Sequence, residues 1–338
     1  MKKICILVVI CILFMISSLG YTKMKDNEIT VYTTQESEDV EELVKDFEAK
    51  HPDIKLNIIK SATGEITAKL LLENGNPQAD VIWNVATSGL LVLDSVNGLA
   101  PYAPPSLDKI DSKYYDTKRE VPTWVGTTIW TGVITVNTEE AKKKGLPIPE
   151  TYEELADPIY MNEIVMPDPI ASGTGYLMVN SWLQSKGEET GWDFIKKIND
   201  NMKFYTTSGS APAKSTAIGE QVIGLSFDKN SLKIEKDVPQ IKTIFAKDGL
   251  PYEIDACALV NKKEIKEEAK IFYDWATSVE TIEKYKNSRI LTTLKGSEPA
   301  EGIPNNFKEM LSNNDLYWAA ENKNRISLEW NQKIKGSK

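Results

Sequence analysis

Hydroxyl residues alternate with glycines in two short segments, Ser172–Gly175 and Thr207–Ser210. Each segment follows a short apolar run and opens a segment with helical spacing. Backbone N–H groups at the start of a helix favour anions, and glycine leaves that backbone open to a ligand. The two segments therefore predict an oxyanion site, with ordinary N-capping by Ser and Thr as the alternative for each. The sequence has no P-loop pattern, so a nucleotide is not indicated.

Other candidate contacts lie at the ends of apolar runs elsewhere in the chain. In parallel α/β sheets ligands bind beyond the carboxyl ends of the strands, where loops open into helices. The residues found at such ends are Thr33, Thr34, Trp83, Asn84, Trp130, Tyr205 and Asp228, together with Ser208 and Ser210 of the second hydroxyl segment. The aromatic members either wall a pocket or fill a core. Asp228 and Glu36 are carboxylates that could receive an ammonium group, and solvated surface acids are the alternative.

Enzymatic chemistry finds little support in the residue types. His51 is the one histidine and precedes Pro52, where a surface or capping role is expected. A Ser-His-Asp triad would need it, and no Gly-x-Ser-x-Gly elbow is present. The clusters of His, Cys and carboxylates that zinc hydrolysis requires are also missing. We therefore expect no catalytic residue, no metal and no cofactor.

The N-terminus carries the pattern of a secretion signal. Lys2 and Lys3 precede an apolar run over 4–16, and small residues follow up to Gly20. Because a membrane span needs about 20 apolar residues, we predict a cleaved signal peptide over residues 1–20, with an uncleaved anchor as the alternative. Cleavage removes Cys5 and Cys11, so the remaining Cys257 can form neither an intramolecular disulfide nor a Cys-based metal site.

Charge and length exclude some classes of protein. The chain has 49 acidic against 40 basic residues and a formal net charge of −9. Binding to nucleic acid relies on clustered positive charge, so no nucleic-acid partner is expected. A length of 338 residues exceeds what one core usually supports, which predicts two domains.

Strand and helix patterns alternate along the chain, which predicts an α/β fold with parallel-rich sheets covered by helices. We expect the chain to cross from a first lobe to a second near 130–136 and to return near 246–256, through a two-stranded hinge. Lobe one would hold residues 28–130 plus 256–338, and lobe two residues 131–255. The strands are predicted at 29–33, 54–59, 79–83, 132–136, 164–166, 204–206, 222–227 and 256–260.

Several motifs are shared with one family. They are Ala79–Trp83, Glu150–Tyr160, Val165–Pro169, Ser172–Tyr176 and Gly219–Asp228. Together they resemble the ferric-iron, thiamine, polyamine and phosphonate group of ABC-importer solute-binding proteins, over nearly all of the chain after residue 20. The combination with Thr207–Ala213 is most similar to binding proteins for 2-aminoethylphosphonate. The resemblance implies the two-lobed, type II periplasmic-binding-protein-like fold.

The resemblance also implies a function and a set of ligand contacts. The protein would capture 2-aminoethylphosphonate outside the cytoplasm, as a monomer, and present it to an ABC permease in the membrane. The phosphonate would be held by Thr34, Ser172, Gly173, Thr174 and Ser208 or Ser210, and Asp228 would face the amine. Polyamine, thiamine, sugar phosphate and iron remain alternatives within the fold, and a secreted phosphoester hydrolase remains one outside it.

Iron is disfavoured within this set by two departures from the iron-binding members. Those members carry adjacent tyrosines at the strand that ends near Phe227 and a histidine after the first strand. Here the matching stretches read Ser226-Phe227-Asp228 and Gln35-Glu36. A hard ferric ion without tyrosinates is not expected.

Overall fold

The computed structural model describes residues 27–73, 75–287, 289–300, 303–312 and 314–336. The predicted signal peptide, residues 1–20, lies outside this described part. Among the described residues, no helix combines the length and apolar character needed to cross a membrane.

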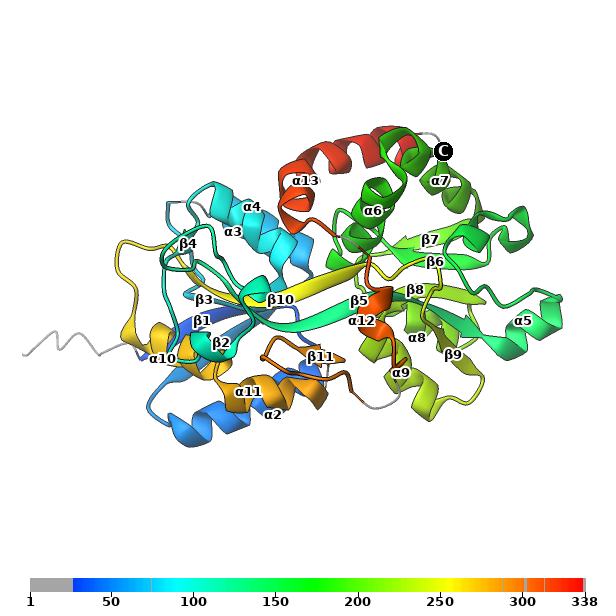
Figure 1. The fold of residues 1–338 in the computed structure, drawn as a ribbon. Helices are drawn as coiled ribbons and strands as arrows, with labels where there is room; N and C mark the ends of the chain where they lie inside the picture. Colours follow the sequence, from blue (N-terminus) through cyan, green and yellow to red (C-terminus); the bar gives the residue numbers. More distant parts are fainter. Residues whose placement is uncertain (1–26, 74, 288, 301–302, 313, 337–338) are drawn as a thin grey trace, which may run out of the picture.

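Strands and helices alternate through most of the chain (Figure 1). The strands are β1 (Glu28–Thr33), β2 (Lys55–Lys60), β3 (Val81–Ala86), β4 (Leu99–Ala100), β5 (Val125–Asn137), β6 (Ile164–Pro167), β7 (Met202–Thr206), β8 (Ile223–Phe227), β9 (Ile241–Ile244), β10 (Tyr252–Val260) and β11 (Leu291–Thr292). The helices are α2 (Ser37–Lys50), α3 (Thr63–Leu72), α4 (Thr87–Ser95), α5 (Thr138–Lys144), α6 (Gly173–Lys186), α7 (Glu188–Asn201), α8 (Ala211–Ala217), α9 (Asp228–Asp237), α10 (Glu267–Ala276), α11 (Val279–Lys284), α12 (Phe307–Met310), α13 (Leu316–Trp330) and the π-helical turn η6 (Asn331–Lys335).

The first half of the chain builds a sheet around β1. Strands β2 and β3 pair with β1 in parallel, as the alternation of strands and helices predicts. Every residue of β3 is buried, because helices cover both faces of the sheet (Figure 1). Strand β3 runs to Ala86, three residues beyond the predicted end, so Asn84 lies inside the strand with a left-handed φ of 49°. The prediction that Asn84 sits in a loop after the strand was wrong.

Two long strands connect the halves. Strand β5 has 13 residues, all of them buried, where only 132–136 was predicted. It pairs antiparallel with β10 up to Thr131, and from Gly132 onward it pairs antiparallel with β8. The sheet is therefore mixed at its centre. The start of β10 at Tyr252 was missed because buried acids, Glu253 and Asp255, interrupt its apolar pattern.

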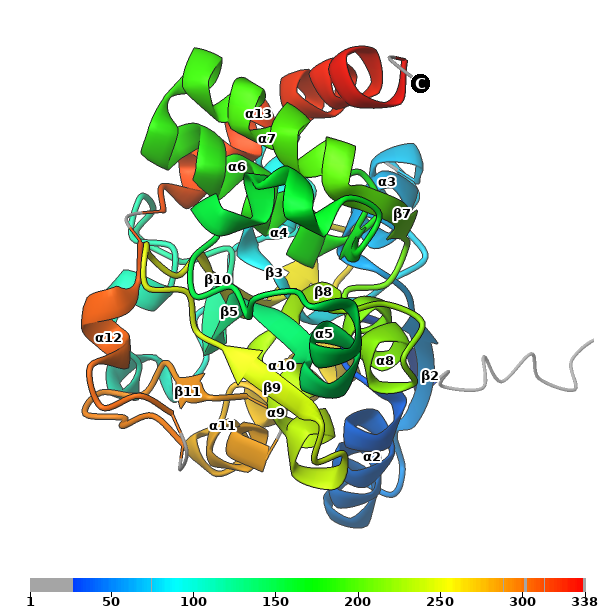
Figure 2. The same ribbon diagram turned by 90° about the vertical axis from the view of Figure 1, so that its right-hand side faces the viewer.

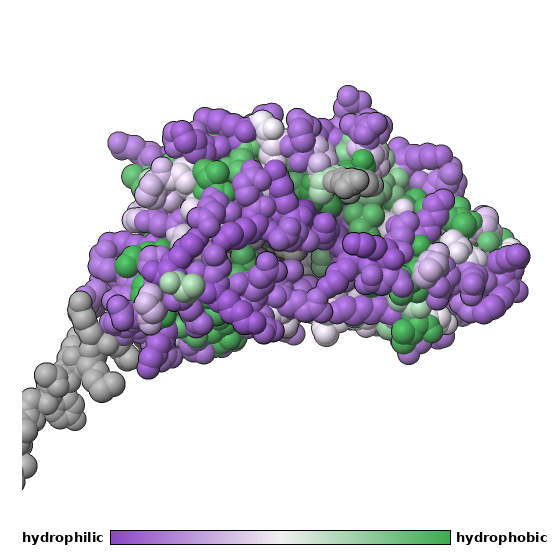
Figure 3. All heavy atoms as spheres, turned by 90° about the horizontal axis from the view of Figure 1, so that it is seen from below, coloured by the Kyte–Doolittle hydropathy of each residue, from purple (hydrophilic) through white to green (hydrophobic). Residues whose placement is uncertain are grey.

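The second half is an α/β unit around β6, which pairs in parallel with β7 and β8. Figure 2 faces this half and shows α6, α7 and α13 above the sheet, with α9 below it. Charged and polar residues cover most of the surface seen from below, with apolar residues scattered among them (Figure 3).

The C-terminal segment departs from the predicted division into lobes. Helix α10 and Ile282 of α11 pack in the same core as β1 and β3 of the first lobe. Phe307, Trp330 and Ile334, however, lie in the core of the second lobe. The prediction that all of 256–338 belongs to lobe one was therefore wrong for this segment. The reason is that α13 presents apolar residues to α4 at its start and to lobe two further along.

Candidate functional site

A cavity of about 350 Å³ lies between the two lobes. Its walls come from loops at the ends of strands and from the first turns of helices, which is the usual position of a ligand in an α/β sheet. Both lobes contribute to the lining, which consists of Thr34, Glu36, Lys60, Ser61, Ala62, Thr63, Glu65, Trp130, Ser172, Gly173, Thr174, Thr207, Ser208, Gly209, Ser210, Phe227, Asp255 and Arg289.

Lobe one brings the starts of two helices to the cavity. Glu36 is the N-cap residue of α2, and Ala62 and Thr63 begin α3. Thr34 follows β1, and its hydroxyl donates to the carbonyl of Asn84 at 2.8 Å. Asn84 thus positions a cavity residue from within β3. The Glu36 carboxylate pairs with Lys60 at 3.1 Å, and Lys60 lowers the pKa of Glu36 despite the opposing effect of burial. Glu36 therefore stays ionised beside the cavity.

Lobe two brings both predicted hydroxyl segments to the cavity. Ser172 and Ser210 occupy the N-cap positions of α6 and α8, but neither side chain makes a capping hydrogen bond within the described residues. Ser208 Oγ lies 3.1 Å from Ser210 Oγ. The N-capping alternative therefore does not describe these two serines. The start of α6 presents backbone N–H groups beside hydroxyl oxygens, an arrangement that suits a tetrahedral anion.

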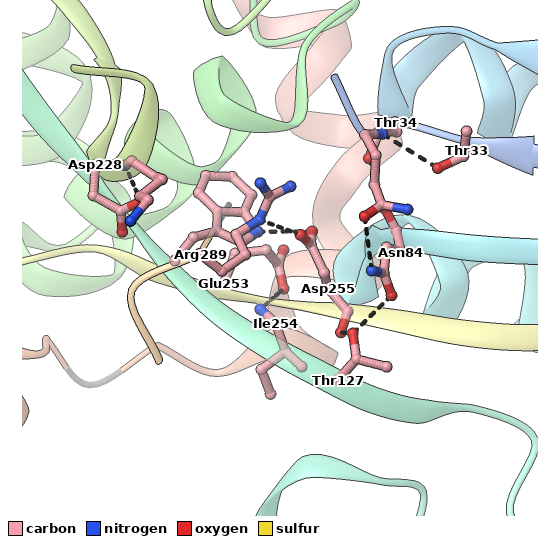
Figure 4. Close-up of polar contacts among 12 residues, drawn as sticks. Thr33, Thr34, Asn84, Thr127, Asp228, Glu253, Ile254, Asp255 and Arg289 are labelled. Carbon is pink, nitrogen blue, oxygen red and sulfur yellow. Dashed lines mark hydrogen bonds and ion pairs between the residues drawn. The ribbon is translucent and has the colours of Figure 1, made fainter. Parts of the chain in front are cut away.

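The end of the cavity near the hinge carries a buried ion pair. Arg289 Nε donates to Asp255 Oδ2 at 2.7 Å, and the indole of Trp130 donates to Asp255 Oδ1 at 2.8 Å (Figure 4). The Arg289 guanidinium also lies 5.7 Å from the centre of the Phe227 ring. Burial acts against the charge of Arg289, but neighbouring Asp255 outweighs it and the pKa of Arg289 is raised. The cavity therefore contains a permanently charged guanidinium.

Arg289 and Asp255 were missed by the sequence analysis. Arg289 precedes the two-residue strand β11, and Asp255 lies within β10, so neither follows a recognisable apolar strand. One signal was available, because Arg289 is one of only three arginines in the chain. Arginine is the residue best suited to bidentate recognition of phosphate and carboxylate groups.

Three predicted contacts lie away from the cavity wall. Trp83 is fully buried among aromatic residues of lobe one, and its indole donates to Tyr285 Oη at 2.7 Å. Thr33 is also buried, with its hydroxyl accepting from the backbone N–H of Gln35. The Tyr205 ring packs on Trp330 with 5.2 Å between centroids. Trp83 and Thr33 lie in the core and Tyr205 is partly buried against it, because side chains along a strand alternate between the cleft and the helix layer.

Asp228 was predicted to face the cavity, but it is not among the residues that line it. It begins α9 and is fully buried, and its Oδ2 accepts from the backbone N–H of Thr131 at 2.7 Å. Figure 4 shows it apart from the Arg289–Asp255 pair. Burial raises the pKa of Asp228 to about 7, although backbone hydrogen bonds from Thr131 and Lys229 oppose this shift. Its carboxylate joins β5 to the start of α9, which is a structural role at the hinge.

Two α/β lobes that share a long central strand and enclose a polar cavity define a two-lobed binding protein. The chain belongs to the bacterial extracellular solute-binding protein family, whose model matches residues 80–319. Membership of this family implies a location outside the cytoplasm. The homologues are binding proteins, which supports the prediction of a protein without catalytic activity.

Similar proteins agree with this assignment. An uncharacterised protein of Haemophilus influenzae is 28% identical over 318 residues, 92% of this chain and 91% of that protein. The periplasmic binding protein AfuA from Actinobacillus pleuropneumoniae, solved with exogenous fructose-6-phosphate, is 28% identical with a TM-score of 0.84, covering 91% of this chain and 98% of that one. Iron-bound HitA from Pseudomonas aeruginosa shares the fold at 18% identity, with a TM-score of 0.77 and coverage of 91% and 99%.

Proposed function

We propose that this protein captures a small phosphorylated organic solute between its lobes and delivers it, as a secreted monomer, to an ABC permease. One observation carries the proposal: Arg289 and the starts of α3 and α6 all line the same cavity. A guanidinium, two sets of helix-start N–H groups and several hydroxyls supply hydrogen bonds to every oxygen of a phosphoryl group. Most of these groups are neutral, so the site needs few positively charged side chains. This is consistent with the negative net charge of the protein.

Sugar phosphates are the class that we favour. The cavity volume of about 350 Å³ exceeds what a seven-atom phosphonate fills, and the walls also offer Glu36, Glu65 and Asp255 as acceptors for sugar hydroxyls. Trp130 and Phe227 provide apolar surface for a sugar ring. The similarity to AfuA, whose structure holds fructose-6-phosphate, supports the same choice.

2-Aminoethylphosphonate is the second candidate. The carboxylates of Glu36 and Glu65 line the cavity, so either offers an ammonium group a partner in place of buried Asp228. Polyamine and thiamine lack the oxyanion that the helix starts would hold, and none of the described residues that line the cavity is a tyrosine that could ligate iron.

Titration calorimetry at low ionic strength tests the proposal. The panel contains glucose 6-phosphate, fructose 6-phosphate, 2-aminoethylphosphonate, ethylphosphonate, fructose, phosphate, spermidine, thiamine and ferric citrate. We expect a hexose phosphate to bind with a Kd of about 1 μM or below, which corresponds to roughly −8 kcal/mol, and the free sugar at least about 100-fold more weakly.

Two results would count against the assignment. Tight binding of spermidine or ferric citrate, with no response to any phosphorylated compound, would refute an oxyanion site. Metal-dependent turnover of p-nitrophenyl phosphate would favour the hydrolase alternative, since a binding protein releases its ligand unchanged.

A further inference from the structure

The two lobes touch directly beside the cavity at a main-chain contact. The backbone N–H of Gly64, in the first turn of α3, donates to the carbonyl of Ala171 at 3.0 Å. Ala171 lies in the loop that leads into α6. The contact therefore joins the first turn of α3 to the loop before α6, and both helices begin at the cavity.

Gly64 has no room for a side chain in this arrangement. A Cβ atom there would lie 2.1 Å from the carbonyl oxygen of Ile170 and 2.7 Å from that of Ala171. Both obstacles are backbone atoms of the opposite lobe, so no rotamer change relieves the clash. A second glycine lies on the same seam, because a Cβ at Gly173 would lie 2.7 Å from Thr63 Oγ1.

A different kind of contact closes the other side of the cleft. Glu38 of α2 forms an ion pair with Lys233 of α9, and both side chains are exposed. In Figure 1, α3 and α6 lie above the central sheet, whereas α2 and α9 lie below it. The lobes are thus held together on both sides of the sheet, by backbone on one side and by flexible charged side chains on the other.

We propose that Gly64 is the residue that permits the closed, solute-retaining state, because only a missing side chain lets α3 meet the Ala171 carbonyl. Any larger residue would hold the lobes apart while leaving each half of the binding site intact. Glu38 and Lys233 belong to different lobes, so separation of the lobes by the added side chain would also separate this ion pair. The proposal rests on capture of a solute by lobe closure and not on which solute is bound.

Carbodiimide cross-linking measures closure with natural residues. The reagent joins a carboxylate and an amine in contact, so the amide between Glu38 and Lys233 reports closed molecules. The ion pair of Lys50 and Glu280, with 2.6 Å between its charged atoms inside lobe one, is the internal reference. Peptide mass spectrometry quantifies the ratio of the two amides for the parent and for Gly64→Ala, without ligand and with glucose 6-phosphate or 2-aminoethylphosphonate.

We expect the ratio to fall roughly tenfold or more in Gly64→Ala, a factor equivalent to about 1.4 kcal/mol against closure. Thermal unfolding of the ligand-free variant should occur at the same temperature as the parent or slightly higher, because alanine is a better helix former than glycine. A fold defect would lower both quantities, so a lower ratio with an unchanged or higher unfolding temperature identifies a closure defect.

The outcomes separate this proposal from the ligand assignment. An equal ratio in parent and variant, or no interlobe amide in the parent under any condition, would overturn the role of Gly64. A parent that forms the amide equally with and without the phosphorylated compounds, together with a lower ratio in the variant, would support Gly64 and count against those ligands.

Discussion

Arg289 Nε donates a hydrogen bond of 2.7 Å to Asp255 Oδ2 at the wall of the interlobe cavity. Both side chains are almost completely buried, at 10% and 3% exposure. Asp255 belongs to β10 and Arg289 precedes β11, so the pair also joins β10 to the segment that leads into β11. Each charge compensates the burial of the other, and the guanidinium remains at the place where an anion would bind.

Replacing Arg289 should affect stability and binding separately. Arg289→Gln leaves the Asp255 carboxylate buried without its cation, so we expect a loss of about 3 to 5 kcal/mol in the free energy of unfolding. The double variant Arg289→Gln with Asp255→Asn should recover much of that stability but not the affinity for glucose 6-phosphate. Urea unfolding and calorimetry measure the two quantities. Parent-like affinity in the double variant would exclude Arg289 as an anion contact.

Thr174 offers a test of the helix-start anion site with an isosteric control. Thr174→Asp places a negative charge on the first turn of α6, where it occupies the positive end of the helix and repels an incoming anion. We expect affinity for a phosphorylated ligand to fall by about 100-fold or more, equal to about 2.7 kcal/mol. Thr174→Asn introduces a side chain of the same shape as aspartate but without its charge, so this variant should lose much less affinity. Equal losses in the two variants would mean that shape and not charge matters at this position.

Asp228→Asn should change the pH dependence of stability without changing ligand selectivity. The pKa of Asp228 is raised to about 7 in the folded protein by burial, above its unfolded value of about 4. The folded state therefore binds an extra proton between these values, and its stability falls as the pH rises through this window.

The asparagine variant cannot titrate, so its unfolding free energy should fall less steeply between about pH 4 and pH 7. The slope will not vanish, because burial also raises the pKa of Glu253 to about 7. Chemical unfolding at several pH values gives the slope. The affinities for 2-aminoethylphosphonate and ethylphosphonate should change equally. A loss of affinity for the amine-bearing compound alone would show that Asp228 contacts the ligand's amine.

Local sequence patterns were sufficient to predict the class of fold and the half of the cavity wall that lobe two contributes. Alternating strands and helices predicted the α/β architecture, and the comparison with known structures confirmed the two-lobed fold. The segments Ser172–Gly175 and Thr207–Ser210 were placed at helix starts by glycine and hydroxyl residues that follow apolar runs. Such signals are local, because the strand end, the turn and the first helical turn lie within a few residues of one another.

Tertiary structure alone decided which strand-end side chains reach the cavity and which partners they meet. Side chains on a strand alternate between two faces, so a shift of one residue exchanges cavity and core, and Trp83 and Thr33 fell on the buried side. Arg289 and Asp255 are 34 residues apart, and no local pattern brings them together. The closeness of Gly64 to Ala171 depends on how two separately built lobes meet, which is set by the hinge and by packing across the whole molecule and not by the residues around either one.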